Sequence, residues 1–210
     1  MKYQAIVLAA GNSSRSNLNY NKNLYKIDNQ PIIHYSTINF LNDKDCSKVI
    51  IVCKENELST ISSIFNNENK IVFALGGNTR QESVRNGLSY VDEKYVLVHD
   101  GARPHFSNDL LEKLKDKVVE HHSVIPVISI NDTIKVIKDN KVVKTLNRDE
   151  IKRVQTPQAF DTYILKKAHD LASNNMYSDD SSMLEEILQI STYVVDGEVK
   201  NIKYTNPEDF

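Results

Sequence analysis

The 210-residue sequence has no tryptophan and only two cysteines, Cys46 and Cys53. These cysteines form no Cys-X-X-Cys motif and have no clustered histidines, so neither a zinc site nor a disulfide scaffold is expected. The longest apolar runs, such as residues 5–10, are far shorter than the roughly 18–20 residues of a membrane span. The N-terminus leads directly into a strand-like segment without a signal-peptide pattern. We therefore expect a cytoplasmic protein with no membrane partner.

The sequence also lacks an excess of charge of either sign. Its 26 basic and 28 acidic residues give a formal net charge of −2, which provides no bulk attraction to nucleic acid. With 40% hydrophobic and 26% charged residues, the chain is typical of globular proteins and can bury a sizeable core. Its length fits one domain. We predict a single domain with no nucleic-acid partner.

Arginine is scarce among the basic residues. Only six of the 26 basic residues are arginines, and several of these fall inside motif-like segments. The planar guanidinium fork binds phosphates and carboxylates in a bidentate way that lysine cannot copy. Chance placement is the alternative for any single arginine, but the grouping in motifs marks these arginines as candidate functional residues.

Short apolar segments alternate with helix-like segments along the chain. Nearly all-apolar runs are typical of parallel strands buried on both faces, and short connections predict right-handed crossovers. Strands are expected at residues 3–9, 48–53, 70–75, 95–99 and 123–128. Helices are expected at about residues 31–41, 58–64, 80–91, 108–121, 162–173 and 180–188. The predicted fold class is α/β, Rossmann-like, with a mostly parallel sheet and helices on both faces.

The alternation breaks near residue 131. Two strand-like runs, residues 133–137 and 142–146, are joined by the polar residues 138–141, which is typical of a β-hairpin. We predict that this hairpin leaves the core as an arm over about residues 131–153. A last pair of strands is expected around residues 196–197.

Two glycine-containing loops follow predicted strands, and open parallel sheets bind ligands beyond the carboxyl ends of their strands. Residues 9–15 (AAGNSSR) and 76–83 (GGNTRQES) can turn backbone N–H groups toward an anion. Arg15 and Lys22 add positive charge to the first loop. Neither loop matches the GxGxxG or P-loop motif, and each, taken alone, is equally consistent with an ordinary turn or helix N-cap.

A third loop, residues 99–104 (HDGARP), follows the strand at residues 95–99. Asp100 offers the hard carboxylate oxygens that Mg²⁺ prefers, and Arg103 lies close enough in sequence to meet a phosphate. A structural Asp–Arg pair is the alternative. His99, which ends the strand, is interpreted as a packed or hydrogen-bonded histidine rather than a metal ligand.

Several other polar residues receive structural interpretations. The pair at residues 121–122 (HH) ends a predicted helix, where it favours the helix dipole. Asp179 and Asp180 form a carboxylate pair, but Asp180 is interpreted as the N-cap of the following helix. Cys46 and Cys53 are interpreted as core or surface thiols.

Taken in order, these motifs resemble those of the 2-C-methyl-D-erythritol 4-phosphate cytidylyltransferase family. The resemblance runs from Ile6 to the C-terminus and is carried by AAGNSSR…NKN, GGNTRQESVRNGL, VHDGARP, NDTIK, LNR, QTPQAF, SDDSSMLEE and NIKYTNPEDF. DTIK followed by an arginine before QTPQ favours the methylerythritol member over polyol-phosphate relatives. The resemblance implies one nucleotidyltransferase domain over residues 1–210. That domain would join CTP to methylerythritol phosphate, releasing pyrophosphate, in non-mevalonate isoprenoid biosynthesis.

The resemblance also implies roles for individual residues. Asp100 would hold the cofactor, Mg²⁺. The catalytic positions would be Arg15, Lys22, Arg148 and Lys203. The nucleotide-binding positions would be Ala9, Ala10, Gly11, Asn12, Ser13, Gly77, Asn78, Arg80 and Ser83. The sugar-phosphate positions would be Arg103, Thr133, Arg148 and Lys203. The family's arm reaches into a partner subunit, which implies a homodimer in which Thr133 and Arg148 serve the neighbour's site.

Four residues of the first loop region depart from the family pattern. The family usually has glycine at Ser13 and methionine at Ser16, and its lysine is flanked by proline and glutamine where Asn21 and Asn23 stand. Both basic residues of the loop are kept. Two alternatives follow: CTP-dependent transfer to another polyol phosphate such as ribitol 5-phosphate, and nucleotide binding without turnover.

Overall fold

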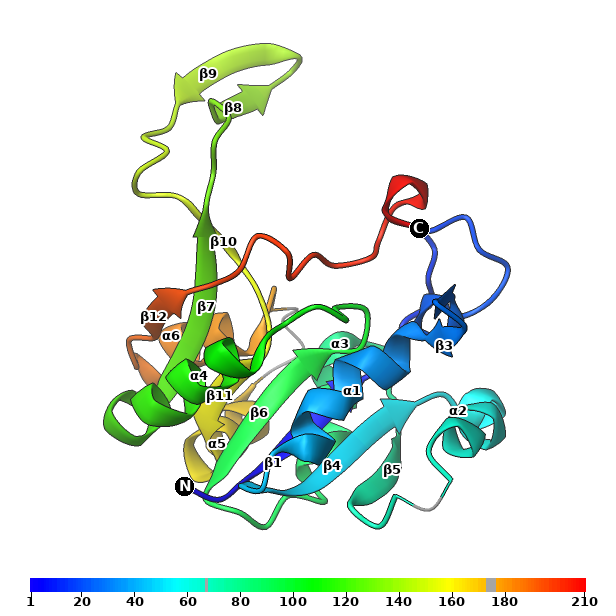
Figure 1. Cartoon of the computed structure of the whole chain (residues 1–210). Coiled ribbons are helices and arrows are strands. Elements are labelled where there is room, and N and C mark those ends of the chain that lie inside the picture. Colours follow the sequence, from blue (N-terminus) through cyan, green and yellow to red (C-terminus); the bar gives the residue numbers. More distant parts are fainter. Residues whose placement is uncertain (67, 173–176) are drawn as a thin grey trace.

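A computed structural model of the chain describes residues 1–66, 68–172 and 177–210. Its main sheet has eight strands in the order β10-β7-β11-β6-β1-β4-β5, with β12 paired to β7 (Figure 1). Neighbours β6, β1, β4 and β5 are all parallel, whereas β11 runs antiparallel to β6 and β7. The strands are β1 (Tyr3–Leu8), β4 (Cys46–Cys53), β5 (Ile71–Leu75), β6 (Tyr95–Asp100), β7 (Ser123–Ser129), β10 (Lys152–Val154), β11 (Gln158–Asp161) and β12 (Tyr193–Asp196). The predicted mostly parallel α/β sheet is confirmed.

Helices cover both faces of this sheet, as expected (Figure 1). One apolar cluster packs α1 (Ile32–Asn42), α2 (Leu58–Ile64) and α4 (Asn108–His121) against the first face. A second cluster packs α3 (Arg80–Leu88), α5 (Thr162–Leu171) and α6 (Asp180–Leu188) against the other. No described helix is long and apolar enough to cross a membrane.

Strand β4 shows why the sheet strands read as continuous apolar runs. Val49 and Ile51 belong to the first cluster, whereas Ile50 and Val52 belong to the second. Alternate side chains of a strand point to opposite faces, and all four are fully buried. The burial of each such side chain contributes roughly 1.5–3 kcal/mol to the stability of the fold. Packing on both faces therefore holds the sheet in the middle of the protein.

The predicted arm is confirmed as a separate hairpin that projects from the body (Figure 1). Strands β8 (Lys135–Lys138) and β9 (Lys141–Thr145) pair antiparallel, and all their residues are exposed. Asp139 and Asn140 make the turn with φ of 49° and 59°, the left-handed conformation that two-residue hairpin turns require. A smaller hairpin of β2 (Lys26–Ile27) and β3 (Gln30–Pro31) was not predicted.

The predicted last pair of strands is wrong. Only β12 forms there, and the following residues 197–204 contain no strand. Their backbone is instead held by isolated long-range bonds, such as Gly197 N to Val127 O (2.8 Å) and Tyr204 N to Ala102 O (2.9 Å). The segment therefore crosses the carboxyl ends of the sheet rather than extending it.

Two helix ends also differ from expectation. Helix α3 ends at Leu88 rather than at residue 91, because the backbone turns so that Val91 enters the core through a bond from its N–H to Leu88 O (3.2 Å). Helix α5 ends at Leu171, and the predicted end at residue 173 lies outside the described residues.

Candidate functional site

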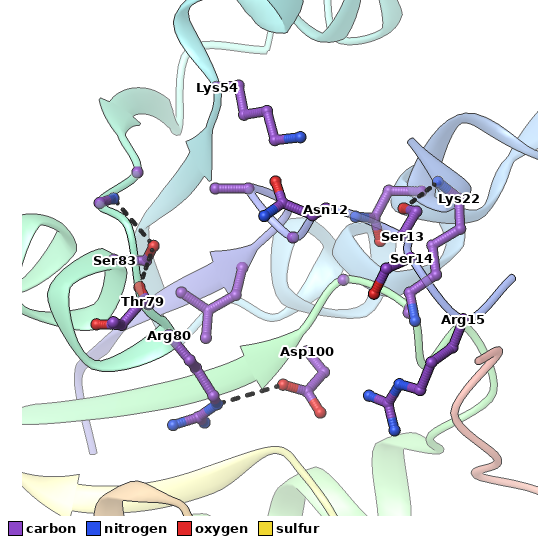
Figure 2. A pocket seen from close by; sticks show the side chains of 18 of the residues that line it. Asn12, Ser13, Ser14, Arg15, Lys22, Lys54, Thr79, Arg80, Ser83 and Asp100 are labelled. Atoms are coloured by element: carbon purple, nitrogen blue, oxygen red, sulfur yellow. Dashed lines mark hydrogen bonds and ion pairs between the residues drawn. The ribbon is translucent and has the colours of Figure 1, made fainter. Parts of the chain in front are cut away.

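Two adjoining cavities open where the parallel strands end. The larger has a volume of about 610 Å³ and the smaller about 420 Å³. The larger is walled by the loop after β1, the short 3-10 helix η1 (Lys22–Leu24), the loop before α3 and the end of β6 (Figure 2). The two cavities share three residues, Arg80, Asp100 and Lys203. These three charged side chains therefore stand at the boundary between two compartments.

Most of the predicted site residues meet at these cavities. The larger cavity is lined by Ala10, Gly11, Asn12, Ser13, Arg15, Lys22, Gly77, Asn78, Arg80, Ser83, Asp100 and Lys203. Arg103 lines the smaller one. Three predicted residues line neither cavity: Ala9, Thr133 and Arg148. Ala9 is buried beneath the larger cavity, whereas Thr133 and Arg148 lie with the exposed arm, and their service to a neighbour stays a prediction.

Ser13 adopts a backbone conformation that explains why glycine is usual at this place. Its φ is 54°, a left-handed value that glycine takes most easily. Two hydrogen bonds offset the strain: Lys22 N donates to Ser13 Oγ (2.9 Å), and Ser16 Oγ donates to Ser13 O (2.7 Å). The serine hydroxyl therefore ties the β1 loop to η1, and Lys22 with it (Figure 2).

Asn21 and Asn23, two further departures from the family pattern, anchor η1 to neighbouring segments. The buried Asn21 amide donates to Ala9 O (2.7 Å) and to Glu57 Oε2 (2.7 Å). Its carbonyl oxygen accepts from Asn23 N (3.0 Å) as the N-cap of η1. Each departure thus has a structural role in holding the turn that carries Lys22.

The loop before α3 opens a helix, as predicted for the glycine pair. Gly76 has no room for a side chain, because a Cβ there would overlap Ala10 Cβ. Ser83 Oγ accepts from Gly77 N (3.1 Å) and donates to Thr79 O (2.9 Å). Close packing and the serine together fix this wall of the larger cavity (Figure 2).

Asp100 lies among three cations. Its carboxylate is 2.8 Å from Lys203 Nζ, 3.7 Å from Arg80 Nε and 3.6 Å from Arg103 Nε. Burial acts to raise the pKa of Asp100, but these neighbours, Lys203 foremost, hold that pKa well below its usual range. The carboxylate is therefore ionised throughout the physiological range.

The Asp100 carboxylate fits a particular kind of metal site. No group of three His, Cys, Asp or Glu that could hold a metal occurs among the described residues. Among the residues that the structure describes, Asp100 is the one carboxylate that lines the larger cavity. Mg²⁺ commonly binds through one or two carboxylates together with substrate phosphates, and one ionised carboxylate beside a phosphate-sized cavity satisfies that requirement.

His99 behaves as predicted, as a packed and hydrogen-bonded residue. It is fully buried against Phe40 and Phe106. Burial lowers its pKa to about 3, so the ring is neutral. Its Nε2 lies 3.0 Å from Arg103 O and its Nδ1 3.0 Å from Thr156 Oγ1. Because a carbonyl only accepts, Nε2 carries the proton, and Thr156 donates to Nδ1.

The side chain of Arg103 is largely engaged in contacts with other residues of the chain. Its Nη1 donates to Asn201 O (2.9 Å), and its side chain is only 12% exposed. Arg103 thus holds the crossing C-terminal segment, and through it Lys203, against the end of β6. This contact explains how a residue near the C-terminus reaches the site.

The interpretation of Asp180 as a helix N-cap is wrong. Asp179 caps α6 by accepting from Ser182 N (2.9 Å). Asp180 is instead buried and pairs with Arg80 and His169. Capping depends on the backbone conformation, and it is Asp179 that has the extended backbone which a cap requires.

Ser14, Gly76 and Thr79 also line the larger cavity and lie in the two predicted loops, although they were not named as site residues; Lys54 was not predicted at all. Lys54 follows β4 directly, and the rule that ligands bind beyond the carboxyl ends of strands could have found it. With Lys54 included, five cations face one carboxylate in the larger cavity: Arg15, Lys22, Lys54, Arg80 and Lys203. The cavity therefore favours a highly charged anion.

The pKa of Lys22 is lowered strongly from its ordinary value. Burial, and then the neighbouring charges of Lys203 and Arg15, lower the pKa of Lys22 to about 8. The ammonium is charged at neutral pH but loses its proton near pH 8 when no anion is bound. A bound triphosphate favours the charged form and so competes with this loss.

We expect nucleotide binding to weaken as the pH rises past this pKa. Calorimetric titration with CTP should show affinity falling between pH 7 and pH 9, because neutral Lys22 attracts no phosphate. In Lys22→Arg, whose guanidinium keeps its charge, the fall should be much smaller. Equal losses in both proteins would contradict this role of Lys22.

Comparisons with known proteins agree with this geometry. The family model for 2-C-methyl-D-erythritol 4-phosphate cytidylyltransferase matches residues 3–210. The protein of that name from Halalkalibacterium halodurans is 36% identical over 216 residues, covering 100% of this chain and 94% of the relative.

Solved structures give the same result. The 4-diphosphocytidyl-2C-methyl-D-erythritol synthase of Anaerococcus prevotii superposes with a TM-score of 0.88 at 30% identity, covering 99% of this chain and 94% of that one. The 2-C-methyl-D-erythritol 4-phosphate cytidylyltransferase of Francisella tularensis has a TM-score of 0.83 at 33% identity, covering 100% and 96%. The resemblance inferred from the motifs is thus confirmed over the whole chain, which belongs to the 2-C-methyl-D-erythritol 4-phosphate cytidylyltransferase family.

Proposed function

We propose that this chain transfers the cytidylyl group of CTP to 2-C-methyl-D-erythritol 4-phosphate, releasing pyrophosphate, in non-mevalonate isoprenoid biosynthesis. One observation carries the proposal: two adjoining cavities share Arg80, Asp100 and Lys203 at their boundary. A reaction between two phosphate compounds needs two compartments that meet at such a charged boundary. Membership of the family supplies the identities of the two substrates.

The chemistry explains the residues that the site holds. A phosphate oxygen of the acceptor attacks the α-phosphorus of CTP, a new P–O bond forms, and the bond to pyrophosphate breaks. Because the attacking oxygen is already an anion, no general base is needed. The protein must offset the repulsion between two anions and hold them in line. Cations placed before the reaction perform both tasks.

In the proposed arrangement, CTP occupies the larger cavity. Its triphosphate lies against the β1 loop, with Arg15 and Lys22 as charge partners. Gly77 and Asn78 of the loop before α3, together with Ser83 of α3, hold the cytidine. Asp100 would hold Mg²⁺, which would supply positive charge to offset part of the phosphate charge. Lys203 stays beside the reacting phosphates.

The acceptor occupies the smaller cavity. Hydroxyl-bearing and carboxylate side chains line it, including Thr156, Ser181 and Asp179, together with Arg103. These groups suit a polyol with one phosphate, whose charge lies toward Lys203. A direct test is pyrophosphate release from CTP and Mg²⁺ with either methylerythritol phosphate or ribitol 5-phosphate. Turnover with the first acceptor alone is expected. Turnover with ribitol 5-phosphate alone would favour another polyol phosphate as the acceptor. CTP binding without turnover would contradict the proposed enzymatic activity.

The proposal includes a homodimer that forms through the arm. Four apolar side chains of the hairpin are 40–62% exposed, namely Val136, Ile137, Val142 and Val143. A polar excursion that exposes apolar side chains needs a surface to cover them, and a two-fold partner can offer its own arm in return. Thr133 and Arg148 line neither cavity of their own chain, which fits service to the neighbour's acceptor site.

A complementation experiment tests this arrangement. Lys22→Ala damages the body of a subunit and Arg148→Ala its arm, so each homodimer should be nearly inactive. A mixed dimer would contain one doubly damaged site and one intact site. At full statistical mixing, half the dimers are mixed and half their sites are intact, so activity should return to about a quarter of the parent's. No recovery, despite subunit exchange seen by mass spectrometry, would show that each subunit uses its own arm.

The expected cytoplasmic location stays a prediction. Both cysteines are free and buried, and burial raises the pKa of each thiol to about 11. Neutral thiols of this kind suit a reducing compartment and have no part in the proposed chemistry.

A further inference from the structure

Arg80 contacts two carboxylates through two different nitrogens of its guanidinium. Its Nη1 donates to Asp180 Oδ2 at 2.7 Å, and its Nε lies 3.7 Å from Asp100 Oδ1. Figure 2 shows Arg80 extending from the start of α3 toward Asp100. The short contact is thus with Asp180, which does not line the larger cavity.

Asp180 reaches Arg80 from a distant part of the chain. It is the first residue of α6, one hundred positions after Arg80, and its side chain is 1% exposed. Its other oxygen, Oδ1, lies 3.3 Å from Nε2 of His169 on α5, whose side chain is also 1% exposed. A carboxylate only accepts hydrogen bonds, so His169 donates. Both oxygens of Asp180 are therefore engaged, and the carboxylate cannot rotate freely.

A buried carboxylate with this geometry has a specific effect on Arg80. A guanidinium that had Asp100 as its only partner would close the 3.7 Å gap and compete with Lys203 for the Asp100 oxygens. The strong contact with Asp180 holds Arg80 back. Asp100 then keeps a carboxylate edge toward the cavity while Arg80 stays at the boundary of both compartments.

We propose that Asp180, supported by His169, is a positioning residue that fixes the Arg80 guanidinium at the boundary between the two cavities. This inference rests on the proposed function, because Arg80 is assigned there to nucleotide binding. It adds that helices α5 and α6 control where the charged groups of the larger cavity are placed, although neither helix contributes a cation to that cavity. Lysine is not an equivalent of Arg80, because only the planar guanidinium offers two separate nitrogens, Nη1 and Nε, toward Asp180 and Asp100.

A double-mutant cycle on turnover tests the inference. The enzymes compared are the parent, Asp180→Asn, Arg80→Ala and the double variant, assayed by pyrophosphate release with CTP, Mg²⁺ and methylerythritol phosphate. Asparagine keeps the shape of Asp180 but loses its charge. We expect Asp180→Asn to lower kcat/KM on the order of 10–100-fold in the parent, because misplacing a reacting-site group is costly. In the Arg80→Ala background the same change should cost under about threefold, since coupled residues are not additive.

A matched control separates positioning from general support of the helices. Asp161 caps α5 by accepting from Tyr163 N and Ile164 N and has no contact with Arg80. Asp161→Ala should lower Tm in thermal unfolding but leave kcat/KM within about twofold. If Arg80→Ala does not fold, Arg80→Met replaces it in the cycle, because methionine keeps much of the side chain's length but offers Asp180 no donor.

The outcomes are distinct. Equal losses from Asp180→Asn in both backgrounds, or no loss in the parent background, would overturn the inference while leaving the proposed function in place. A parent without turnover would overturn the proposed function and the inference with it. A loss confined to the background with Arg80 supports the positioning role.

Discussion

Replacing Lys22 with alanine is expected to lower kcat on the order of 10²–10³-fold while leaving the fold nearly unchanged. Lys22 lines the larger cavity, and no ion pair engages its ammonium within the described ranges 1–66, 68–172 and 177–210. The charge is therefore available to the triphosphate. The turn that carries Lys22 is held by Ser13 and Asn21. Alanine at position 22 preserves both bonds, because the Ser13 hydroxyl accepts from the backbone of Lys22 and the Asn21 side chain accepts from the backbone of Asn23.

The control for this prediction is Lys26→Ala. Lys26 is exposed on β2, four residues along, and lines neither cavity, so its loss should leave kcat within about twofold. Thermal unfolding should give nearly the same Tm for both variants and the parent. A folded Lys22→Ala protein with parental kcat would remove Lys22 from the proposed chemistry.

The sheet could be predicted from the sequence because its strands are buried on both faces. Residues 48–53 read as one apolar run, and the structure divides them between two cores. In a folded protein, a continuous apolar run of this length is typical of a strand that is buried on both faces. Helix α4 could be placed to the residue for a similar reason: Ser107 caps it by accepting from Leu110 N (3.1 Å), and its apolar residues recur with helical spacing.

The C-terminal segment could not be predicted because its partners are remote. Asn201 donates to Thr156 O (2.9 Å), and the Gln155 amide donates to Asn201 O (3.0 Å). These bonds replace the ladder of a strand pair and depend on where β11 and the loop before it lie. Local alternation of residues suggested strands, but tertiary bonds decide the conformation.

The loops of the site could be predicted from the sequence, but the hydrogen bonds and ion pairs that hold them could not. Glycines and charges beyond strand ends mark a cavity from sequence alone. The left-handed φ of Ser13, the bonds of Asn21 and the Arg80–Asp180 pair leave no such signal. Ser13 and Asn21 could only be read as departures from a pattern, although the structure gives both a role in holding Lys22.

Replacing Asp100 with asparagine is expected to lower kcat/KM on the order of 10²-fold or more and to change the Mg²⁺ dependence of what activity is left. Asparagine keeps the size of the side chain but lacks the charge that a hard cation prefers. It also leaves Arg80, Arg103 and Lys203 without the carboxylate that they share. The remaining activity should need more Mg²⁺ for half its maximum.

Two measurements distinguish a metal ligand from a structural partner. Initial rates at increasing Mg²⁺ report the metal requirement, and thermal unfolding reports the loss of the ion pairs. Asp116→Asn, which removes an exposed carboxylate of α4 that lines neither cavity, should change neither quantity. If Asp100→Asn lowers Tm but titrates with Mg²⁺ as the parent does, Asp100 is not the ligand, and its role is to fix Arg103 and Lys203 at the end of β6.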